Sequence, residues 1–167
     1  MDQKEVMGRL CRDTVTHAKG VCIGTVDWMF GCRYYILKKR ATKDKHPSYS
    51  KEQEFHVAEG CLEVIDSEPV IKADFPEEEK PKFFGKMCRD KVTGYEGICI
   101  GRLWPYYAEK QYCLQGRYDK KKMKTDMPMW VDEGRIEVLR SDRELSTEDV
   151  RTTRGGGVTD LCLPEFH

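Results

Sequence analysis

An internal repeat constrains the fold of this chain more than any other feature. Residues 8–24 align with residues 85–101 at a constant shift of 77 positions, and ten of the seventeen pairs are identical. Self-similarity sets the size of the structural unit, so we expect two copies of a unit of about 60 residues. The identical pairs are Gly8/Gly85, Cys11/Cys88, Arg12/Arg89, Asp13/Asp90, Val15/Val92, Thr16/Thr93, Gly20/Gly97, Cys22/Cys99, Ile23/Ile100 and Gly24/Gly101.

A second block of similarity closes each copy. Val57–Ile65 aligns with Val131–Leu139 at the smaller shift of 74, so the loop between the two blocks contains an insertion or deletion. The copies therefore share both ends and differ in the middle. We predict a first repeat over residues 7–65 and a second over residues 84–139.

The segments outside the repeats have the composition of connectors. Residues 66–83 contain three prolines and an acidic run, which is typical of an extended, solvated linker. Residues 140–167 lose apolar content and include three consecutive glycines, so we expect a flexible C-terminal tail.

The pattern within each copy predicts β-strands. Runs of β-branched and aromatic residues flank the short segment Thr16–Gly20, as in a β-hairpin, and Thr93–Gly97 repeats this arrangement. No stretch has the 3.6-residue periodicity of an amphipathic helix. The fold class expected is mainly β, with two tandem small SH3-like β-barrels related by internal duplication and an exposed linker between them. The strands expected in the first copy are 10–15, 21–28, 32–37, a short one at His56–Val57, and 61–65.

The charge balance excludes a global electrostatic function. The 29 basic and 29 acidic side chains cancel, so any attraction to an anionic partner must be local. The N-terminus carries charges where a secretory signal needs an apolar core, and no apolar run reaches the roughly 18 residues of a membrane span. We expect a cytoplasmic protein with no membrane partner.

The eight cysteines are expected to be reduced thiols in that compartment. No two of them have the C-x2-C spacing that preorganises a zinc site. Cys11 and Cys22, and Cys88 and Cys99 at the same spacing, fall on neighbouring predicted strands, where a metal ion or a disulfide could bridge them. The alternative that we favour is that they are small buried hydrophobic residues, with no metal and no cofactor.

Catalysis is not indicated. Each histidine of the first repeat lacks a counterpart in the second, and none of the common phosphate-loop, zincin or nucleophile-elbow motifs occurs. An Arg-Asp dipeptide is repeated, as Arg12-Asp13 and as Arg89-Asp90. Adjacent side chains of a strand point to opposite faces, so the two residues of each dipeptide do not form one site. They favour cross-strand ion pairs or turn hydrogen bonds over a ligand contact. We therefore predict a non-enzymatic protein.

Two basic loops are the most suggestive functional feature. Each lies between the third and fourth predicted strands of its copy, with aromatic residues nearby. Lysines beside aromatic rings can bind phosphates while the rings stack on bases, which predicts binding of nucleic acid or of a signalling nucleotide. Solubilising surface lysines are the plainer explanation. The candidate cations are Lys38, Lys39, Arg40, Arg117, Lys120, Lys121, Lys122 and Lys124, and the candidate stacking residues are Tyr34, Tyr35, Tyr112 and Tyr118.

A protein-interaction module is the alternative from a different class. Exposed aromatic side chains can anchor a protein interface, and the candidates are Trp28, Trp104 and Trp130. The partner would then be a host or virion protein rather than an anionic ligand.

One pattern resembles a known group of proteins. Cys88–Gly97, which reads R-D-x-V-T-G-Y-x-G after the cysteine, followed by Trp130–Glu133, is similar to a family of small uncharacterised accessory proteins of tailed bacteriophages. The first copy departs from it, because His17-Ala18 replaces Gly94-Tyr95 and His56 replaces Trp130. The resemblance implies a phage accessory protein with a compact β fold, no assigned catalytic residues and a location in the host cytoplasm.

Overall fold

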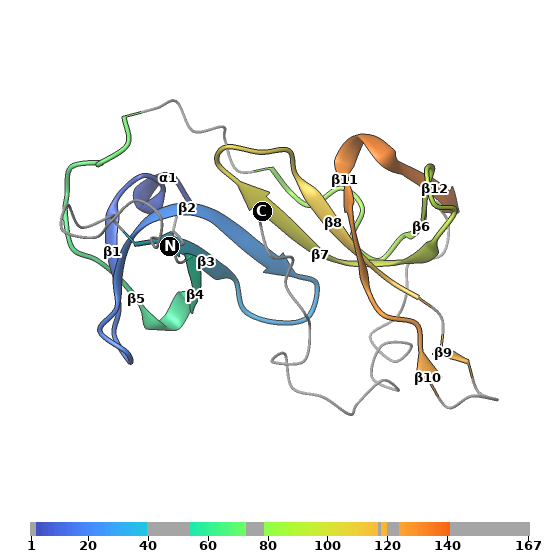
Figure 1. Cartoon of the computed structure of the whole chain (residues 1–167), viewed down its shortest axis with the longest axis horizontal. Coiled ribbons are helices and arrows are strands. Elements are labelled where there is room, and N and C mark those ends of the chain that lie inside the picture. Colours follow the sequence, from blue (N-terminus) through green and yellow to red (C-terminus); the bar gives the residue numbers. More distant parts are fainter. Residues whose placement is uncertain (1–2, 40–53, 73–78, 117, 120–123, 141–167) are drawn as a thin grey trace, which may run out of the picture. The chain divides into compact units, whose positions relative to one another are not determined.

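The chain is mainly β in the computed structural model, as predicted (Figure 1). The structure describes residues 3–39, 54–72, 79–116, 118–119 and 124–140. The chain divides into two compact units, the first formed by Met1–Lys80 with Leu103–Lys110 and the second by Pro81–Arg102 with Gln111–His167.

Five strands and a 3₁₀ turn follow one another in the same order in both units. A short N-terminal helix, α1 (Gln3–Val6), precedes the strands of the first unit. These are β1 (Leu10–Asp13), β2 (Lys19–Trp28), β3 (Tyr34–Lys38), β4 (Glu54–Ala58), the 3₁₀ turn η1 (Glu59–Cys61) and β5 (Leu62–Val64). Their counterparts are β6 (Met87–Asp90), β7 (Glu96–Pro105), β8 (Gln111–Gln115), β11 (Met129–Asp132), the 3₁₀ turn η2 (Glu133–Arg135) and β12 (Ile136–Arg140), with β9 (Tyr118–Asp119) and β10 (Lys124–Thr125) inserted between β8 and β11.

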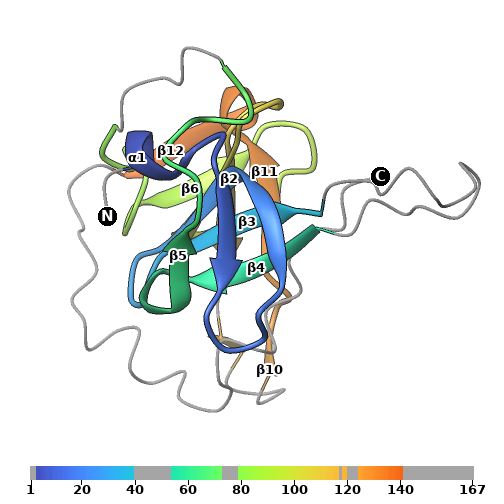
Figure 2. The same ribbon diagram turned by 90° about the vertical axis from the view of Figure 1, so that its left-hand side faces the viewer.

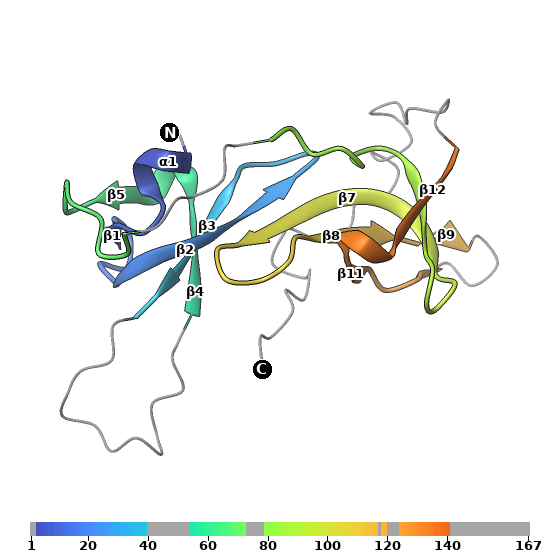
Figure 3. The same ribbon diagram turned by 90° about the horizontal axis from the view of Figure 1, so that it is seen from above.

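Strand order is also the same in the two units. In the first, antiparallel pairing gives β5-β1-β2-β3-β4 (Figure 2). In the second it gives β12-β6-β7-β8-β11, in which the long strand β7 corresponds to β2 (Figure 3). Strands β9 and β10 pair with each other as a separate ribbon.

The prediction of two closed, separate barrels is not met by the strand pairing. Within the described residues, no ladder joins β4 to β5 or β11 to β12, so neither sheet closes on itself through backbone hydrogen bonds. The final residues of β7, from Leu103 onward, belong to the first unit and neighbour β2. Within each unit the described strands thus form an open antiparallel sheet, which the repeat pattern alone did not predict.

Registers agree residue by residue between the units. Cys11 lies opposite Gly20 as Cys88 lies opposite Gly97. Likewise, Tyr35 lies opposite Val57 as Tyr112 lies opposite Val131. Cys11, Gly20 and Tyr35 correspond to Cys88, Gly97 and Tyr112 by the shift of 77, and Val57 corresponds to Val131 by the shift of 74. Both shifts found in the sequence therefore correspond to matched positions in the strand ladders.

The hydrophobic cores use equivalent residues. One cluster contains Cys11, Cys22, Tyr35, Leu37 and Val57, with Val6, Met7 and Leu62. The other contains Cys88, Cys99, Tyr112, Leu114 and Val131. The N-terminal segments contribute alike, since Phe83 and Phe84 pack on the second core at the positions of Val6 and Met7.

The first hairpin of each unit is closed by an aspartate. The Asp90 carboxylate accepts hydrogen bonds from the Val92 N–H at 3.1 Å and the Thr93 hydroxyl at 2.7 Å. Asp13 does the same with Val15 and Thr16 at 3.0 and 2.6 Å. The next residue is left-handed, with φ of 73° at Gly94 and 59° at its counterpart His17. Glycine adopts that conformation without steric cost, so the turn of the second unit is the less strained one.

The beginning of the predicted linker is bound to the first unit. The backbone N–H groups of Val70 and Ile71 both donate to the Gly8 carbonyl oxygen, and the Arg9 guanidinium donates to the Ser67 carbonyl at 2.6 Å. The tail 141–167 lies outside the described residues. Among the described helices, none has the length and apolar character needed to cross a bilayer.

Candidate functional site

Both basic stretches connect equivalent strands. In the first unit Lys38 ends β3 opposite Glu54 of β4, and the stretch continues through Lys39 to Arg40. In the second unit the basic residues lie between β8 and β11. Of the predicted cations, Arg40, Arg117, Lys120, Lys121 and Lys122 lie outside the described residues, and Lys124 is described only as the backbone of β10.

The second basic stretch continues a strand pair already present in the sheet. Leu114 lies opposite Met129, the last pair of the β8–β11 ladder. Four residues after Leu114 and four residues before Met129, Tyr118 lies opposite Thr125, and the next pair is Asp119 opposite Lys124. The pairing of the β9–β10 ribbon therefore has the same register as the β8–β11 ladder, and we call these four strands the second arm. Residues 120–123, which include three lysines, connect its strands in the sequence.

Tyr95 lies at the root of this arm. Its hydroxyl donates to the Met127 carbonyl oxygen at 2.8 Å, and a Cβ added at Gly116 would lie 2.6 Å from that hydroxyl oxygen. Burial raises the pKa of Tyr95. Beside it, the Gln115 side-chain amide donates to the Asp126 carbonyl oxygen at 3.1 Å. Two side chains thus link the two strands of the arm at its root.

The corresponding ends of β3 and β4, which we call the root of the first arm, have different contacts. Lys38 Nζ lies 5.9 Å from the centroid of the Tyr107 ring, and Lys39 Nζ lies 5.9 Å from the Phe55 centroid. The Tyr107 hydroxyl donates to the Glu54 carboxylate at 2.8 Å. Lysines within about 6 Å of ring centroids have the geometry of weak cation–π pairs. These lysines therefore lie beside aromatic rings of their own unit.

Several predicted stacking residues are core residues instead. Tyr35 is 0 % exposed and Tyr112 is 2 % exposed, because both fill the centres of their hydrophobic clusters. Neither can stack on a ligand, so this part of the predicted site is wrong. Trp104 is only 5 % exposed and has Lys110 Nζ 4.1 Å from its ring centroid. Tyr34, Trp28 and Trp130 are half-buried, and the side chain of Tyr118 lies outside the described residues.

The repeated arginines form cross-strand ion pairs. Arg12 lies opposite Glu63 and bonds its carboxylate at 2.5 and 2.9 Å. Arg89 lies opposite Glu137 but bonds Glu96 more closely, at 2.5 Å. These pairs are exposed, so each adds little to stability.

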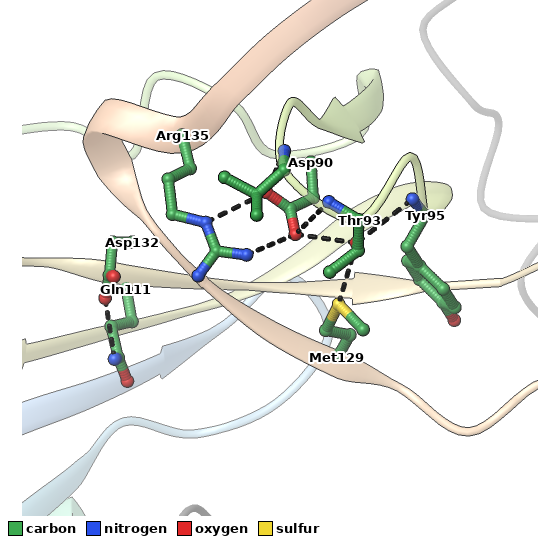
Figure 4. Close-up of polar contacts among 8 residues, drawn as sticks. Asp90, Thr93, Tyr95, Gln111, Met129, Asp132 and Arg135 are labelled. Atoms are coloured by element: carbon green, nitrogen blue, oxygen red, sulfur yellow. Dashed lines mark hydrogen bonds and ion pairs between the residues drawn. The ribbon is translucent and has the colours of Figure 1, made fainter.

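The repeated aspartates have different surroundings in the two units. Asp90 is fully buried and receives a two-pronged ion pair from Arg135, at 2.5 and 3.0 Å (Figure 4). This guanidinium and the Thr93 hydroxyl hold the pKa of Asp90 far below its usual range. Cys61 occupies the position of Arg135 in the first unit, and there the Thr16 hydroxyl is the main cause of the lowered pKa of Asp13.

Five of the described cysteines are buried thiols. Burial raises the pKa of Cys11 and Cys88 to about 11 and that of Cys22 and Cys113 to about 12, and it raises the pKa of Cys99 as well. A thiol with so high a pKa is a poor nucleophile at neutral pH. In the described part of the chain, no group of three or more histidine, cysteine, aspartate or glutamate side chains could hold a metal ion.

One repeated surface was missed by the sequence reasoning. Val15 and Val92 are 71 % and 73 % exposed although they are identical in the two copies. Gly60 and Gly134 are also identical, yet neither has a positive φ, and an added Cβ at either would meet nothing within 4 Å. The turn that carries each valine is hydrogen-bonded to the adjacent 3₁₀ turn, as between the Thr14 N–H and the Cys61 carbonyl oxygen. Identity between copies was visible in the sequence, but exposure was not.

Comparison with known proteins provides no relative: no protein-family model, curated protein or solved structure matches this chain.

Proposed function

We propose that this chain is a non-enzymatic, phage-type accessory protein that binds a phosphate-bearing ligand, nucleic acid or a sequestered nucleotide, through two equivalent basic arms. The protein would act in the cytoplasm of the host. The observation that carries the proposal is that lysine clusters occupy the connection between the same two paired strands in both units. The net charge of the chain is zero, so a positive potential can arise only where basic residues cluster. Such clusters occur at matched positions of the two repeats.

The same proposal includes the fold of each unit. A strand order of β5-β1-β2-β3-β4, with a 3₁₀ turn between the fourth and fifth strands, supports an SH3-like strand arrangement, with an open sheet, duplicated in tandem. The equal registers and equivalent cores support the duplication.

Titration with labelled DNA tests the binding. Fluorescence anisotropy with a single-stranded and a duplex oligonucleotide of about 20 nucleotides, at several salt concentrations, measures affinity and its salt slope. Replacing Lys120, Lys121 and Lys122 by alanine should weaken binding broadly and flatten the slope, because each lost phosphate contact removes counterion release. Replacing Lys72, Lys80 and Lys91, three exposed lysines outside the arms, is the charge-matched control. Equal binding by the arm variant and the control, for both oligonucleotides and for free nucleotides, would eliminate this function.

A protein-interaction module is the second candidate. It is favoured by the repeated exposed pair Val15/Val92 beside the unconstrained glycines Gly60 and Gly134. A glycine that the fold does not need permits close approach of another backbone, and an exposed valine can fill a partner's pocket. Native mass spectrometry of the protein from its source cells distinguishes the candidates. A protein that co-purifies with wild type but not with a Val15→Asp, Val92→Asp variant would support this module, whereas a bound nucleotide or oligonucleotide would support the arms.

A further inference from the structure

We propose that Tyr107 is a base-stacking residue of the first unit, and that it binds an unpaired nucleobase whose phosphate contacts Lys38 and Lys39. The inference rests on the proposed function and deepens it, because it restricts the ligand to a nucleotide or a single strand, whose bases are accessible. All three residues lie in the part of the chain that the structure describes.

A segment of the second repeat supplies the aromatic ring. Leu103–Lys110 includes the end of β7 and the connection to β8, yet it belongs to the first compact unit. The Tyr106 N–H donates to the Ile23 carbonyl oxygen of β2 at 2.6 Å. At Gly24, also in β2, an added Cβ would lie only 2.9 Å from the Cα of Pro105. Close backbone contacts therefore hold this segment against β2.

The Tyr107 side chain lies beside the lysines at the end of β3. Its hydroxyl donates to the Glu54 carboxylate at 2.8 Å, and Glu54 lies opposite Lys38 in the β3–β4 ladder. The Lys38 Nζ lies 5.9 Å from the centroid of the tyrosine ring. Tyr107 is nevertheless 51 % exposed. One hydrogen bond thus orients an exposed aromatic ring next to a cation.

An unpaired nucleotide matches this combination of ring and cations. Every base has a π face that stacks on an aromatic side chain, and lysines beside the ring can contact the phosphate. Lys39, the residue after Lys38, is exposed, and its Nζ lies 5.9 Å from the centroid of the Phe55 ring. Two ammonium groups are therefore present at the strand end that Tyr107 contacts. A base inside a duplex is already stacked on its neighbours, so the site should prefer single strands.

The site combines residues of both repeats. Tyr35 and Tyr112, which the sequence suggested as stacking residues, fill the hydrophobic cores instead. Tyr107 was overlooked because it follows Lys38 by 69 positions and lies in the other repeat. The ring thus comes from the second repeat and the lysines come from the first, so neither repeat contains the site by itself.

The test is Tyr107→Leu, which removes the aromatic ring and keeps an apolar side chain. We expect the affinity for single-stranded oligothymidylate or for a free mononucleotide, measured separately by fluorescence anisotropy, to fall about ten-fold through the loss of stacking. The ligand that responds identifies the source of the base. Tyr107→Phe keeps the ring and loses only the bond to Glu54, so it should bind within about two-fold of wild type. The salt slope should stay at the wild-type value in both variants, because no cation is removed.

Photochemical cross-linking gives a readout that a purely structural role would not change. Oligothymidylate that carries iodouracil should cross-link to Tyr107 on irradiation, and the cross-link should persist in Tyr107→Phe and disappear in Tyr107→Leu. Phe30→Leu is the matched control, because Phe30 occupies the same position in the first repeat and is 43 % exposed. Phe30 follows the opposite end of β2 from Val21, the residue paired with Lys38, so this variant should bind within about two-fold of wild type. Tyr107→Gln, which also lacks a ring, replaces Tyr107→Leu if that variant fails to fold.

The outcomes separate this inference from the proposed function. If a variant with alanine in place of the candidate lysines of both arms binds like wild type, the proposed function itself fails. If that variant loses binding while Tyr107→Leu binds like wild type, the function stands and the stacking role of Tyr107 is refuted. Equal losses in Tyr107→Leu and Tyr107→Phe would also overturn the inference, because the hydroxyl rather than the ring would then be required. Release of a co-purifying protein by Tyr107→Leu, with nucleotide binding unchanged, would instead make the ring a protein contact.

Discussion

Gly97 gives the most direct test of the sheet in the second unit. A Cβ at this position would lie 2.6 Å from the Gln115 carbonyl oxygen and 2.7 Å from its carbon, and both atoms are backbone. The chain of β7 or β8 must therefore move to accept alanine at residue 97. Overpacking of this kind costs about 2–3 kcal/mol, and the lower entropy of unfolded alanine returns about 0.5 kcal/mol. We expect Gly97→Ala to lower the free energy of unfolding by about 2 kcal/mol.

Thermal unfolding followed by circular dichroism measures this loss. For a unit of this size about 2 kcal/mol corresponds to a fall of about 8 to 16 °C in Tm. Gly134→Ala is the matched control, because its Cβ would meet nothing within 4 Å, and we expect a Tm at or slightly above the wild-type value. Equal Tm values for the two variants would show that Gly97 does not lie against the β8 backbone, and the register of β7 and β8 would have to be reassigned.

Three further predictions concern charge, thiols and the turn. Arg135→Met should lower the free energy of unfolding at neutral pH, because it leaves the buried Asp90 carboxylate without its ion-pair partner. Urea titrations should show that the difference in unfolding free energy between wild type and variant becomes smaller as pH falls below the ordinary carboxyl pKa. The pKa of Asp90 is lowered in the folded protein, so its ionised carboxylate stabilises the fold fully above the pKa of the unfolded chain, and this stabilisation is lost as pH falls towards the pKa of the folded state. A difference in unfolding free energy that does not change with pH would contradict this assignment. Among the cysteines that the structure describes, thiol labelling of the native protein should modify the exposed Cys32 first, and elemental analysis should find no stoichiometric zinc. Rapid labelling of the buried thiols would contradict their assignment to the cores. Thr93→Val should cost about 1 kcal/mol by removing the hydroxyl that bonds Asp90, whereas an unchanged midpoint in urea would mean that this bond is dispensable.

The repeat was readable from the sequence for a physical reason. Core cysteines, the aspartate that closes the turn and the glycines opposed to backbone each make a local or cross-strand contact, so the same residue types occur at matched positions of both units. Cys11 and Cys88 are 0 % exposed, and Asp13 and Asp90 accept the same hydrogen bonds. Alternation and turn residues then predicted the strands, with ends that differ from the observed ones by a few residues.

Sequence patterns alone thus predicted that the chain is mainly β, that it contains two matched segments, and that lysines cluster between the same predicted strands of each. The burial of Tyr35 and Tyr112 in the cores and the exposure of Val15 and Val92 became visible only in the folded chain. Burial depends on which strands pack together, and hydrophobic pattern alone does not distinguish a core tyrosine from a surface one. The contact of Tyr95 with Gly116 and Met127 likewise joins residues that are 21 and 32 positions apart. A link of that length depends on the register between strands, which is fixed by long-range packing rather than by local sequence.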